Sequence, residues 1–238
     1  MVDGASLPYD SRVAHEELWL SYGWSFVRTA LPDPPAEVLE IGCGPLGGFV
    51  PALQRDGFTA TGVDPEAPAG PEYRQEEFES YHPPRPVQAV VASTSLHHVS
   101  DLDPALDRMA AVLRPGGTAV VGEGASEAFD EATARWCFAR LPAADPSGEP
   151  GWLQRHRDQW AASGLSWDAY IGGWLAEEGL HPGGKIIDAL GARFVRRSCA
   201  SGPYFFADLA GTTEVDEQAA IDGGQIRAGG IRYAGERR

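Results

Sequence analysis

The sequence has few basic residues for its length. Its 238 residues carry 19 Lys and Arg against 34 Asp and Glu, which gives a formal net charge of -15 at pH 7. Nucleic-acid binding depends on clustered Lys and Arg that neutralise phosphates, so this balance argues against broad binding to a nucleic-acid backbone. We therefore expect a small-molecule partner and no nucleic acid.

Cysteines and long apolar runs are also scarce. Cys43, Cys137 and Cys199 are odd in number and lie far apart, without the paired spacing of a zinc site. They predict no disulfide framework and fit a reducing compartment. No segment approaches the roughly 20 apolar residues of a membrane span, and no apolar run follows basic residues near the start. We expect a cytoplasmic protein that is neither exported nor bound to a membrane.

Strand-like and helix-like segments alternate along the first half of the chain. Strands are expected at residues 36–44, 58–64, 71–78, 87–93 and 117–124, and helices at 47–57 and 103–113. A strand, a helix and a second strand within about 30 residues form the unit of a parallel sheet. The sequence thus predicts an α/β fold with a doubly wound, mostly parallel sheet.

The second half is rich in large aromatic residues. Five of the seven tryptophans lie between residues 126 and 184, in segments of helical periodicity: Trp136, Trp152, Trp160, Trp167 and Trp174. Such rings are the usual way to bury area in a small helical layer, although an aromatic wall can also bind an apolar acceptor. Strand-like runs at 192–210 and 225–236 flank a predicted helix at 212–222 and are expected to form an antiparallel pair.

We therefore expect one domain, 1–238, in four parts. These are an N-terminal helical cap (1–35), a cofactor-binding core (36–125), a helical insertion (126–185) and C-terminal strands that close the sheet (186–238). An exposed part of the aromatic insertion offers a surface for a homodimer.

The segment VLEIGCGPLGGF, residues 38–49, joins the first predicted strand to the first helix. Gly42, Gly44 and Gly47 have the spacing G-x-G-x-x-G, which lets backbone N–H groups approach a nucleotide-like ligand. Asp64 ends the next strand about 20 residues later, where a carboxylate can bind both ribose hydroxyls. These residues suit the adenosine of either NAD or S-adenosylmethionine.

Glu40 distinguishes the two cofactors. A carboxylate is repelled by a pyrophosphate and attracted by the ammonium and sulfonium of S-adenosylmethionine. Glu40 stands two places before the first glycine and so favours the sulfonium cofactor. An NAD-dependent oxidoreductase is the minor alternative.

Residues 38–123 resemble class I S-adenosylmethionine-dependent methyltransferases, most of all the branch that acts on small molecules. The resemblance lies in VLEIGCG, Asp64, VVASTSLHHV and LRPGGTAVV. It implies a Rossmann-like fold, S-adenosylmethionine as cofactor, S-adenosylhomocysteine as product and transfer of a methyl group to a small-molecule acceptor by in-line displacement. The family's loop has a third glycine where this chain has Leu46, with Gly47 and Gly48 just beyond, so we expect a turn one residue wider.

The resemblance also assigns cofactor-binding positions. They are Glu40, Gly42, Cys43, Gly44, Asp64, Pro65, Glu77, Phe78, Ser93 and His97. Asp64 would bind the ribose, while the carboxylate of Glu77 and the backbone N–H of Phe78 would meet the adenine edge.

His97 and Glu123 are the candidate catalytic residues, because they follow the ends of two predicted strands, where ligands collect in open parallel sheets. An imidazole titrates near neutral pH, so His97 is suited to act as a general base or only to line the cofactor pocket. Glu123 is a candidate for orienting a substrate amine or hydroxyl. Alignment of the reactants can supply roughly 7 to 11 kcal/mol, so methyl transfer does not require a base. No convincing cluster of metal ligands is present, and we expect a metal-independent enzyme.

Two other functions fit the same cofactor site. One is an S-adenosylmethionine-binding enzyme that performs a cyclisation or rearrangement, because the fold constrains the cofactor more than the acceptor chemistry. The other is a non-catalytic, cofactor-binding partner subunit, which Leu46 and the lack of an assured base leave open.

Overall fold

A seven-stranded sheet forms the centre of the protein, with strand order β3-β2-β1-β4-β5-β7-β6. The computed structural model describes residues 11–143 and 150–238. The strands are β1 (Glu37–Ile41), β2 (Thr59–Val63), β3 (Tyr73–Arg74), β4 (Val87–Ser93), β5 (Leu113–Gly124), β6 (Phe194–Gly202) and β7 (Gly230–Arg237). Strands β1 to β5 pair in parallel, and β7 is antiparallel to both β5 and β6. The expected α/β fold with a closing antiparallel pair is confirmed.

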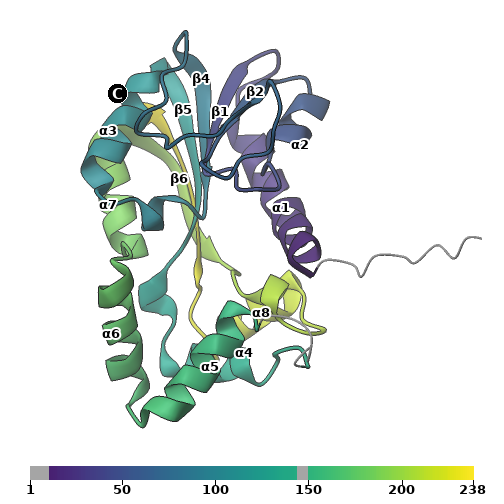
Figure 1. The fold of residues 1–238 in the computed structure, drawn as a ribbon, viewed down its shortest axis with the longest axis vertical. Coiled ribbons are helices and arrows are strands. Elements are labelled where there is room, and N and C mark those ends of the chain that lie inside the picture. Colours follow the sequence, from purple (N-terminus) through teal and green to yellow (C-terminus); the bar gives the residue numbers. More distant parts are fainter. Residues whose placement is uncertain (1–10, 144–149) are drawn as a thin grey trace, which may run out of the picture.

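Helices cover both faces of the sheet (Figure 1). Helices α1 (Ser11–Ala30) and α2 (Val50–Arg55) lie on one face, and α3 (Leu102–Val112) and α7 (Gly183–Arg193) lie on the other. Successive residues of β4 therefore pack in opposite directions, with Ala89 and Val91 toward α2 and Val90 and Ala92 toward α3. This two-sided burial explains why β4 is a nearly continuous apolar run.

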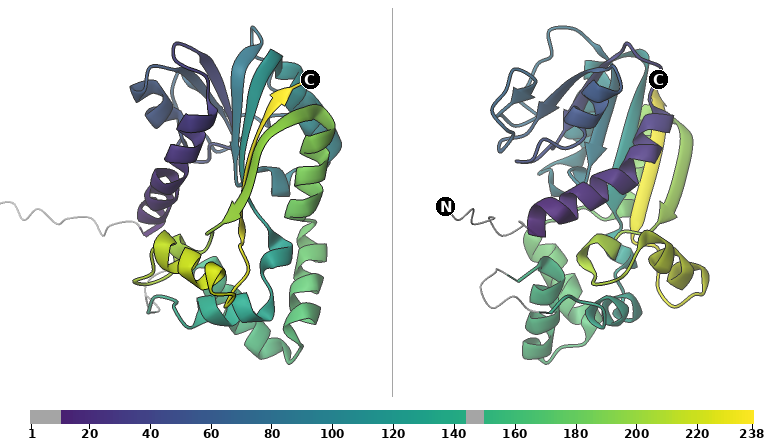
Figure 2. Two further views of the ribbon diagram at one scale, coloured as in Figure 1. Left: turned by 180° about the vertical axis from the view of Figure 1, so that it is seen from behind. Right: turned by 90° about the vertical axis from the view of Figure 1, so that its right-hand side faces the viewer.

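The insertion lies beyond the carboxyl ends of the parallel strands, at the lower end of Figure 1 and in both views of Figure 2. It contains α4 (Glu131–Phe138), α5 (Trp152–Ser163) and α6 (Trp167–Glu178), with α8 (Glu214–Asp222) beside them. These helices have a core of their own around Phe129, Leu153 and Trp167, separate from the two cores of the sheet. The five tryptophans of the insertion all lie in α4, α5 and α6.

Some element bounds differ from the expectations. Helix α2 begins at Val50 instead of residue 47, because Gly47 and Gly48 have φ values of 87° and 55° and prolong the turn. The third strand, expected at 71–78, pairs only at Tyr73–Arg74, since it lies at the edge of the sheet and an exposed acidic segment follows it. The expected boundary at residue 185 falls inside α7, which continues to Arg193 and packs on α3.

Among the residues that the structure describes, no helix has the length and hydropathy needed to span a bilayer.

Candidate active site

The loop after β1 carries the glycines of the G-x-G-x-x-G pattern. Gly42 and Gly44 have φ values of 73° and 63°, in the region that glycine adopts without strain. A Cβ at Gly42 would collide with the side chain of Ser95, whereas no atom lies within 4 Å of a Cβ built at Gly44. The loop thus packs closely against the residues after β4 at Gly42 and faces open space at Gly44, as a loop that binds a ligand requires.

Glu40 lies beneath this loop. Its side chain is buried, and Oε1 accepts a hydrogen bond from the backbone N–H of Phe49 at 3.0 Å. A Cβ at Gly48 would collide with the carboxylate, which explains the need for a glycine there. The carboxylate therefore supports the loop from below and gives it a negative potential that suits a cationic ligand. A direct contact between Glu40 and the cofactor stays a prediction.

Asp64 lies at the edge of the open space above Gly44. Its Oδ2 accepts from the backbone N–H of Gly44 at 3.0 Å, and its Oδ1 accepts from that of Glu66 at 2.7 Å. The carboxylate of this half-exposed residue therefore lies where ribose hydroxyls can compete for it. The side chain of Cys43 is buried against β2, so only its backbone can face a ligand.

The remaining predicted cofactor residues lie around the same edge of the sheet. Phe78 is buried in the core between the sheet and α3, where Arg108 lies over its ring at 5.6 Å and donates to its carbonyl oxygen. Glu77 and Pro65 are exposed, and Ser93 is the half-buried last residue of β4. The contacts of these residues with a cofactor stay predictions.

Thr94, which the sequence analysis missed, has an unusual backbone conformation just after β4. Its φ of 50° is rare for a residue with a Cβ. Its backbone N–H donates to Gly122 at 2.8 Å, and this turn leads the chain into the short 3-10 helix η1 (Leu96–His98). Such strained residues cluster at functional sites. The sequence gives no sign that a threonine adopts a left-handed backbone conformation, whereas the spacing of glycines does indicate a loop that needs such a conformation.

Glu123, at the end of β5, holds η1 in place. Its buried Oε1 accepts from the backbone N–H groups of Ser95 at 2.9 Å and Leu96 at 2.7 Å, and its Oε2 lies 2.6 Å from Nδ1 of His97. A carboxylate accepts in this contact, so Nδ1 of His97 is the donor, and a neutral imidazole in this tautomer has its lone pair on Nε2. Glu123 lies behind His97 and does not line the cavity that His97 faces.

That cavity has a volume of about 590 Å³ and lies between the strand ends and the insertion. Its wall includes His97 and His98 from η1, Trp152 and His156 from α5, Trp174 from α6, and Tyr204 and Phe205 after β6. The volume is typical of small-molecule sites. Burial lowers the pKa of His98, and the neighbouring His97, whose ring centroid is 4.0 Å away, lowers it further. Burial therefore favours the neutral form of the His98 imidazole at the cavity wall.

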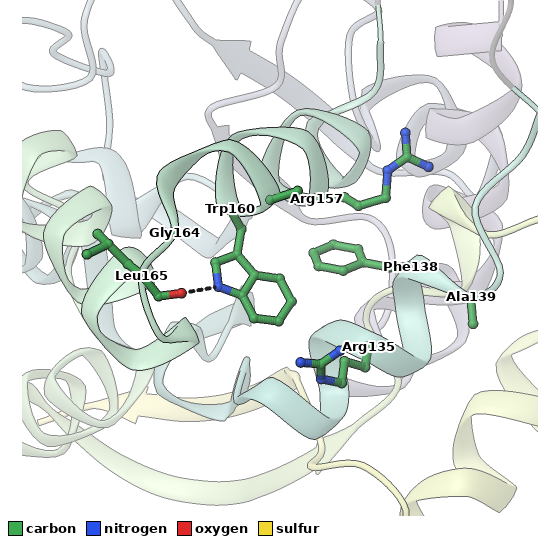
Figure 3. Close-up of a pocket in the computed structure, with 8 residues that line it drawn as sticks. Arg135, Phe138, Ala139, Arg157, Trp160, Gly164 and Leu165 are labelled. Atoms are coloured by element: carbon green, nitrogen blue, oxygen red, sulfur yellow. Dashed lines mark hydrogen bonds between the residues drawn. The ribbon is translucent and has the colours of Figure 1, made fainter.

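A second cleft, of about 630 Å³, opens between α4 and α5 (Figure 3). Trp160 crosses it and donates from Nε1 to the carbonyl oxygen of Leu165 at 3.0 Å, with Arg135 4.9 Å over its ring. Arg135 and Arg157 each form an ion pair with an acidic residue of their own helix. None of the residues that line this cleft lines the cavity at His97, so we do not assign it to the acceptor.

Within residues 11–143 and 150–238, no group of three or more His, Cys, Asp or Glu side chains is arranged to hold a metal ion. Metal independence stays a prediction.

A family model described as "Methyltransferase domain" matches residues 18–167, which is more than half of the chain. The chain belongs to the methyltransferase domain family. A search of curated protein sequences found no match.

Solved structures similar to this methyltransferase share its fold. An S-adenosylmethionine-dependent methyltransferase from Mesorhizobium loti is 21% identical with a TM-score of 0.54, and the match covers 90% of this chain and 97% of that one. Geranyl diphosphate C-methyltransferase from Streptomyces coelicolor A3(2), in complex with Mg²⁺, geranyl diphosphate and S-adenosylhomocysteine, is 16% identical with a TM-score of 0.53, covering 99% and 86%. The N-methyltransferase NodS from Bradyrhizobium japonicum WM9, in complex with S-adenosylhomocysteine, is 15% identical with a TM-score of 0.52, covering 96% and 93%.

The methyltransferase fold is therefore shared, and the prediction of a methyltransferase is confirmed. S-adenosylmethionine as the cofactor of this chain stays a prediction. The residues around the β1 loop fit that cofactor. The loop has open space above Gly44, the carboxylate of Asp64 at its edge and the buried Glu40 beneath it, which are features that a site for a cationic nucleoside requires.

Proposed function

We propose that this methyltransferase methylates an oxygen or nitrogen atom of a small-molecule acceptor bound in the cavity of about 590 Å³. The observation that carries the proposal is that His97, on the wall of this cavity, is paired with the buried Glu123 behind it. The pair lies where β4 and β5 end, on the same edge of the sheet as the loop after β1.

S-adenosylmethionine, when bound, would supply an activated methyl group for in-line displacement by the acceptor nucleophile. The proposed cofactor-binding residues are Glu40, Gly42, Cys43, Gly44, Asp64, Pro65, Glu77, Phe78, Ser93 and His97. Asp64 binds the ribose hydroxyls, and Glu77 with the backbone of Phe78 meets the adenine.

The chain's own catalytic task is to align the acceptor and to remove its proton. Nε2 of His97 accepts the proton from the acceptor's O–H or N–H group, and the charge of Glu123 stabilises the imidazolium that forms. Glu123 is thus a positioning residue, because it acts on the acceptor through His97. The aromatic walls exclude water from the reacting groups.

Binding and transfer test this proposal in two steps. Calorimetry should show that S-adenosylmethionine and S-adenosylhomocysteine bind with micromolar affinity, that NAD does not bind, and that Asp64→Ala loses the binding. Transfer from methyl-labelled cofactor into a panel of hydroxylated and aminated ring compounds should then fall about 10²- to 10⁴-fold in His97→Gln. Cofactor binding without transfer to any acceptor would contradict the proposal, and product formed without consumption of cofactor would indicate the cyclisation or rearrangement alternative.

We further propose a cytoplasmic enzyme without a nucleic-acid partner. The free thiols of Cys43, Cys137 and Cys199 suit a reducing compartment, and the net charge of -15 repels phosphate backbones. A homodimer is supported by the exposed apolar side chains of Leu165 in the insertion and Val195 on β6. Light scattering of the purified protein should give twice the chain mass of 25.4 kDa.

A further inference from the structure

His156 of α5 lies on the wall of the cavity at His97, in an aromatic environment. Its side chain is buried and makes edge contacts with Trp174 and Trp152, at ring-centroid distances of 4.5 Å and 5.7 Å. Burial lowers the pKa of His156 to about 4, and the charge of Arg155 contributes in the same direction. The imidazole is therefore neutral near pH 7 and has one N–H and one lone pair.

A chain of two hydrogen bonds decides which nitrogen carries the proton. Nδ1 of His156 lies 2.8 Å from the hydroxyl oxygen of Tyr170, and this hydroxyl donates to Oε1 of Gln159 at 3.0 Å. A phenol has a single O–H group, which here donates to Gln159, so the Tyr170 oxygen accepts from His156. Nδ1 is then the protonated nitrogen, and Nε2 keeps its lone pair.

Nε2 is available to a ligand. Among the described residues, none forms a hydrogen bond with this atom. Nε2 is also not one of the side-chain nitrogen and oxygen atoms that are fully buried without a hydrogen-bond partner. Arg155 and Glu178 are the two charged side chains on the described cavity wall apart from the histidines, so the wall carries balanced charge. The surroundings of Nε2 therefore suit a neutral, apolar ring compound better than an ion.

We propose that His156 is a specificity-determining residue whose Nε2 accepts a hydrogen bond from an N–H or O–H group of the acceptor molecule. The acceptor is then a neutral, mostly apolar ring compound that carries a hydrogen-bond donor in addition to the atom that becomes methylated. A molecule without this donor would leave Nε2 desolvated and unpaired, which is how a built polar site rejects an analogue. The proposal rests on the proposed function, because it places the acceptor in the cavity that His97 faces.

Matched probe pairs test the role of His156 without any methyl transfer. Indole and 1-methylindole, and 2-naphthol and 2-methoxynaphthalene, differ only in the donor group. We expect the protein saturated with S-adenosylhomocysteine to bind the donor member of each pair about tenfold more tightly in a calorimetric titration. His156→Phe keeps an aromatic ring in place and should equalise the two affinities.

Two further variants separate the hydrogen-bond chain from packing. Tyr170→Phe should reduce the preference, because Nδ1 then has no hydroxyl to donate to and is no longer held in its protonated form. Gln159→Glu should retain the preference, because a carboxylate also accepts a hydrogen bond from the Tyr170 hydroxyl. His97→Gln should retain the preference as well, which assigns the effect to His156. Thermal unfolding of each variant confirms that the protein titrated is folded.

Equal affinities within both pairs, a preference unchanged in His156→Phe, or no binding of any probe to the folded wild type would overturn the proposal. A wild type that prefers the donor probes but transfers no methyl group would contradict the proposed function and leave the role of His156 standing. Methyl transfer without any preference for the donor probes would support the proposed function and contradict the role of His156.

Discussion

At the scale of single residues, three buried glutamates hold the backbone around the proposed cofactor and acceptor regions. Glu40 accepts from Phe49, Glu123 accepts from Ser95 and Leu96, and Glu217 accepts from three consecutive backbone N–H groups at residues 204–206. A carboxylate that accepts several N–H groups recovers part of the free energy lost when it is buried. Each glutamate therefore fixes a loop whose conformation its own apolar residues do not specify.

We expect Glu123→Gln to slow methyl transfer on the order of 10²- to 10⁴-fold. The amide would place an N–H group toward Nδ1 of His97, which moves the imidazole proton to Nε2 and removes the base. Steady-state kinetics should show a lower kcat with unchanged affinity for S-adenosylhomocysteine. Combined with His97→Gln, the second change should add little, because the two residues act as a unit. Losses that multiply in the double variant would contradict this coupling.

We expect Gly48→Ala to weaken S-adenosylmethionine binding at least about tenfold, because the new Cβ collides with the carboxylate of Glu40 and shifts the loop. Gly164 is a matched control, since its φ of 67° carries similar backbone strain while no atom lies within 4 Å of its Cβ position. Gly164→Ala should cost about 1 kcal/mol of unfolding free energy and leave cofactor affinity unchanged. Equal effects of the two substitutions on affinity would exclude the role of Glu40.

At the scale of elements, the sequence predicts those helices and strands whose signal lies within the segment itself. Strand β4 matches its expected range, and α3 differs from its range by one residue at each end, because apolar spacing and the Asp101 cap specify them. The spacing along one βαβ unit points to Glu40, Gly42 and Asp64, which lie around the β1 loop, and their contacts with a cofactor stay predictions. The cavity could not be predicted, since its wall joins η1, α5, α6 and the segment after β6. The His156–Tyr170 contact depends on how two insertion helices pack, and neither residue differs in sequence from an ordinary surface residue.

Packing of α5 against α6 should make the protein sensitive to acid. His156 has a pKa of about 4 when folded and an ordinary value of 6.5, so the unfolded chain binds a proton that the folded chain does not. This contribution to stability is fully present above the unfolded pKa and is lost as the pH falls toward the folded value. When the pH is lowered from about 7 to about 5, the free energy of unfolding measured in urea should fall by about 2 kcal/mol more in the wild type than in His156→Phe. Parallel pH profiles would contradict this account.

At the scale of the whole molecule, the protein has two parts that meet at the proposed acceptor cavity. The sheet has apolar cores on both faces, whereas the insertion has its own aromatic core. Hydrogen bonds join them near the active site, where His181, just before α7, donates its backbone N–H to His97 at 3.1 Å and its ring contacts the carbonyl oxygen of Val99 at 2.9 Å. The strand ends and the insertion therefore contribute different walls of the same cavity.

Cofactor binding should stabilise the molecule by mass action, because a ligand that binds only the folded state shifts the unfolding equilibrium. S-adenosylhomocysteine at about 100 times its Kd adds about 2.7 kcal/mol, which corresponds to roughly 5 to 10 °C in Tm for a chain of this size. Asp64→Ala should abolish the shift, since it removes the proposed ribose contact, and Glu123→Gln should retain it. A thermal shift caused by NAD and not by S-adenosylhomocysteine would reverse the electrostatic argument from Glu40, because a loop above a buried carboxylate would then prefer a pyrophosphate to a cation.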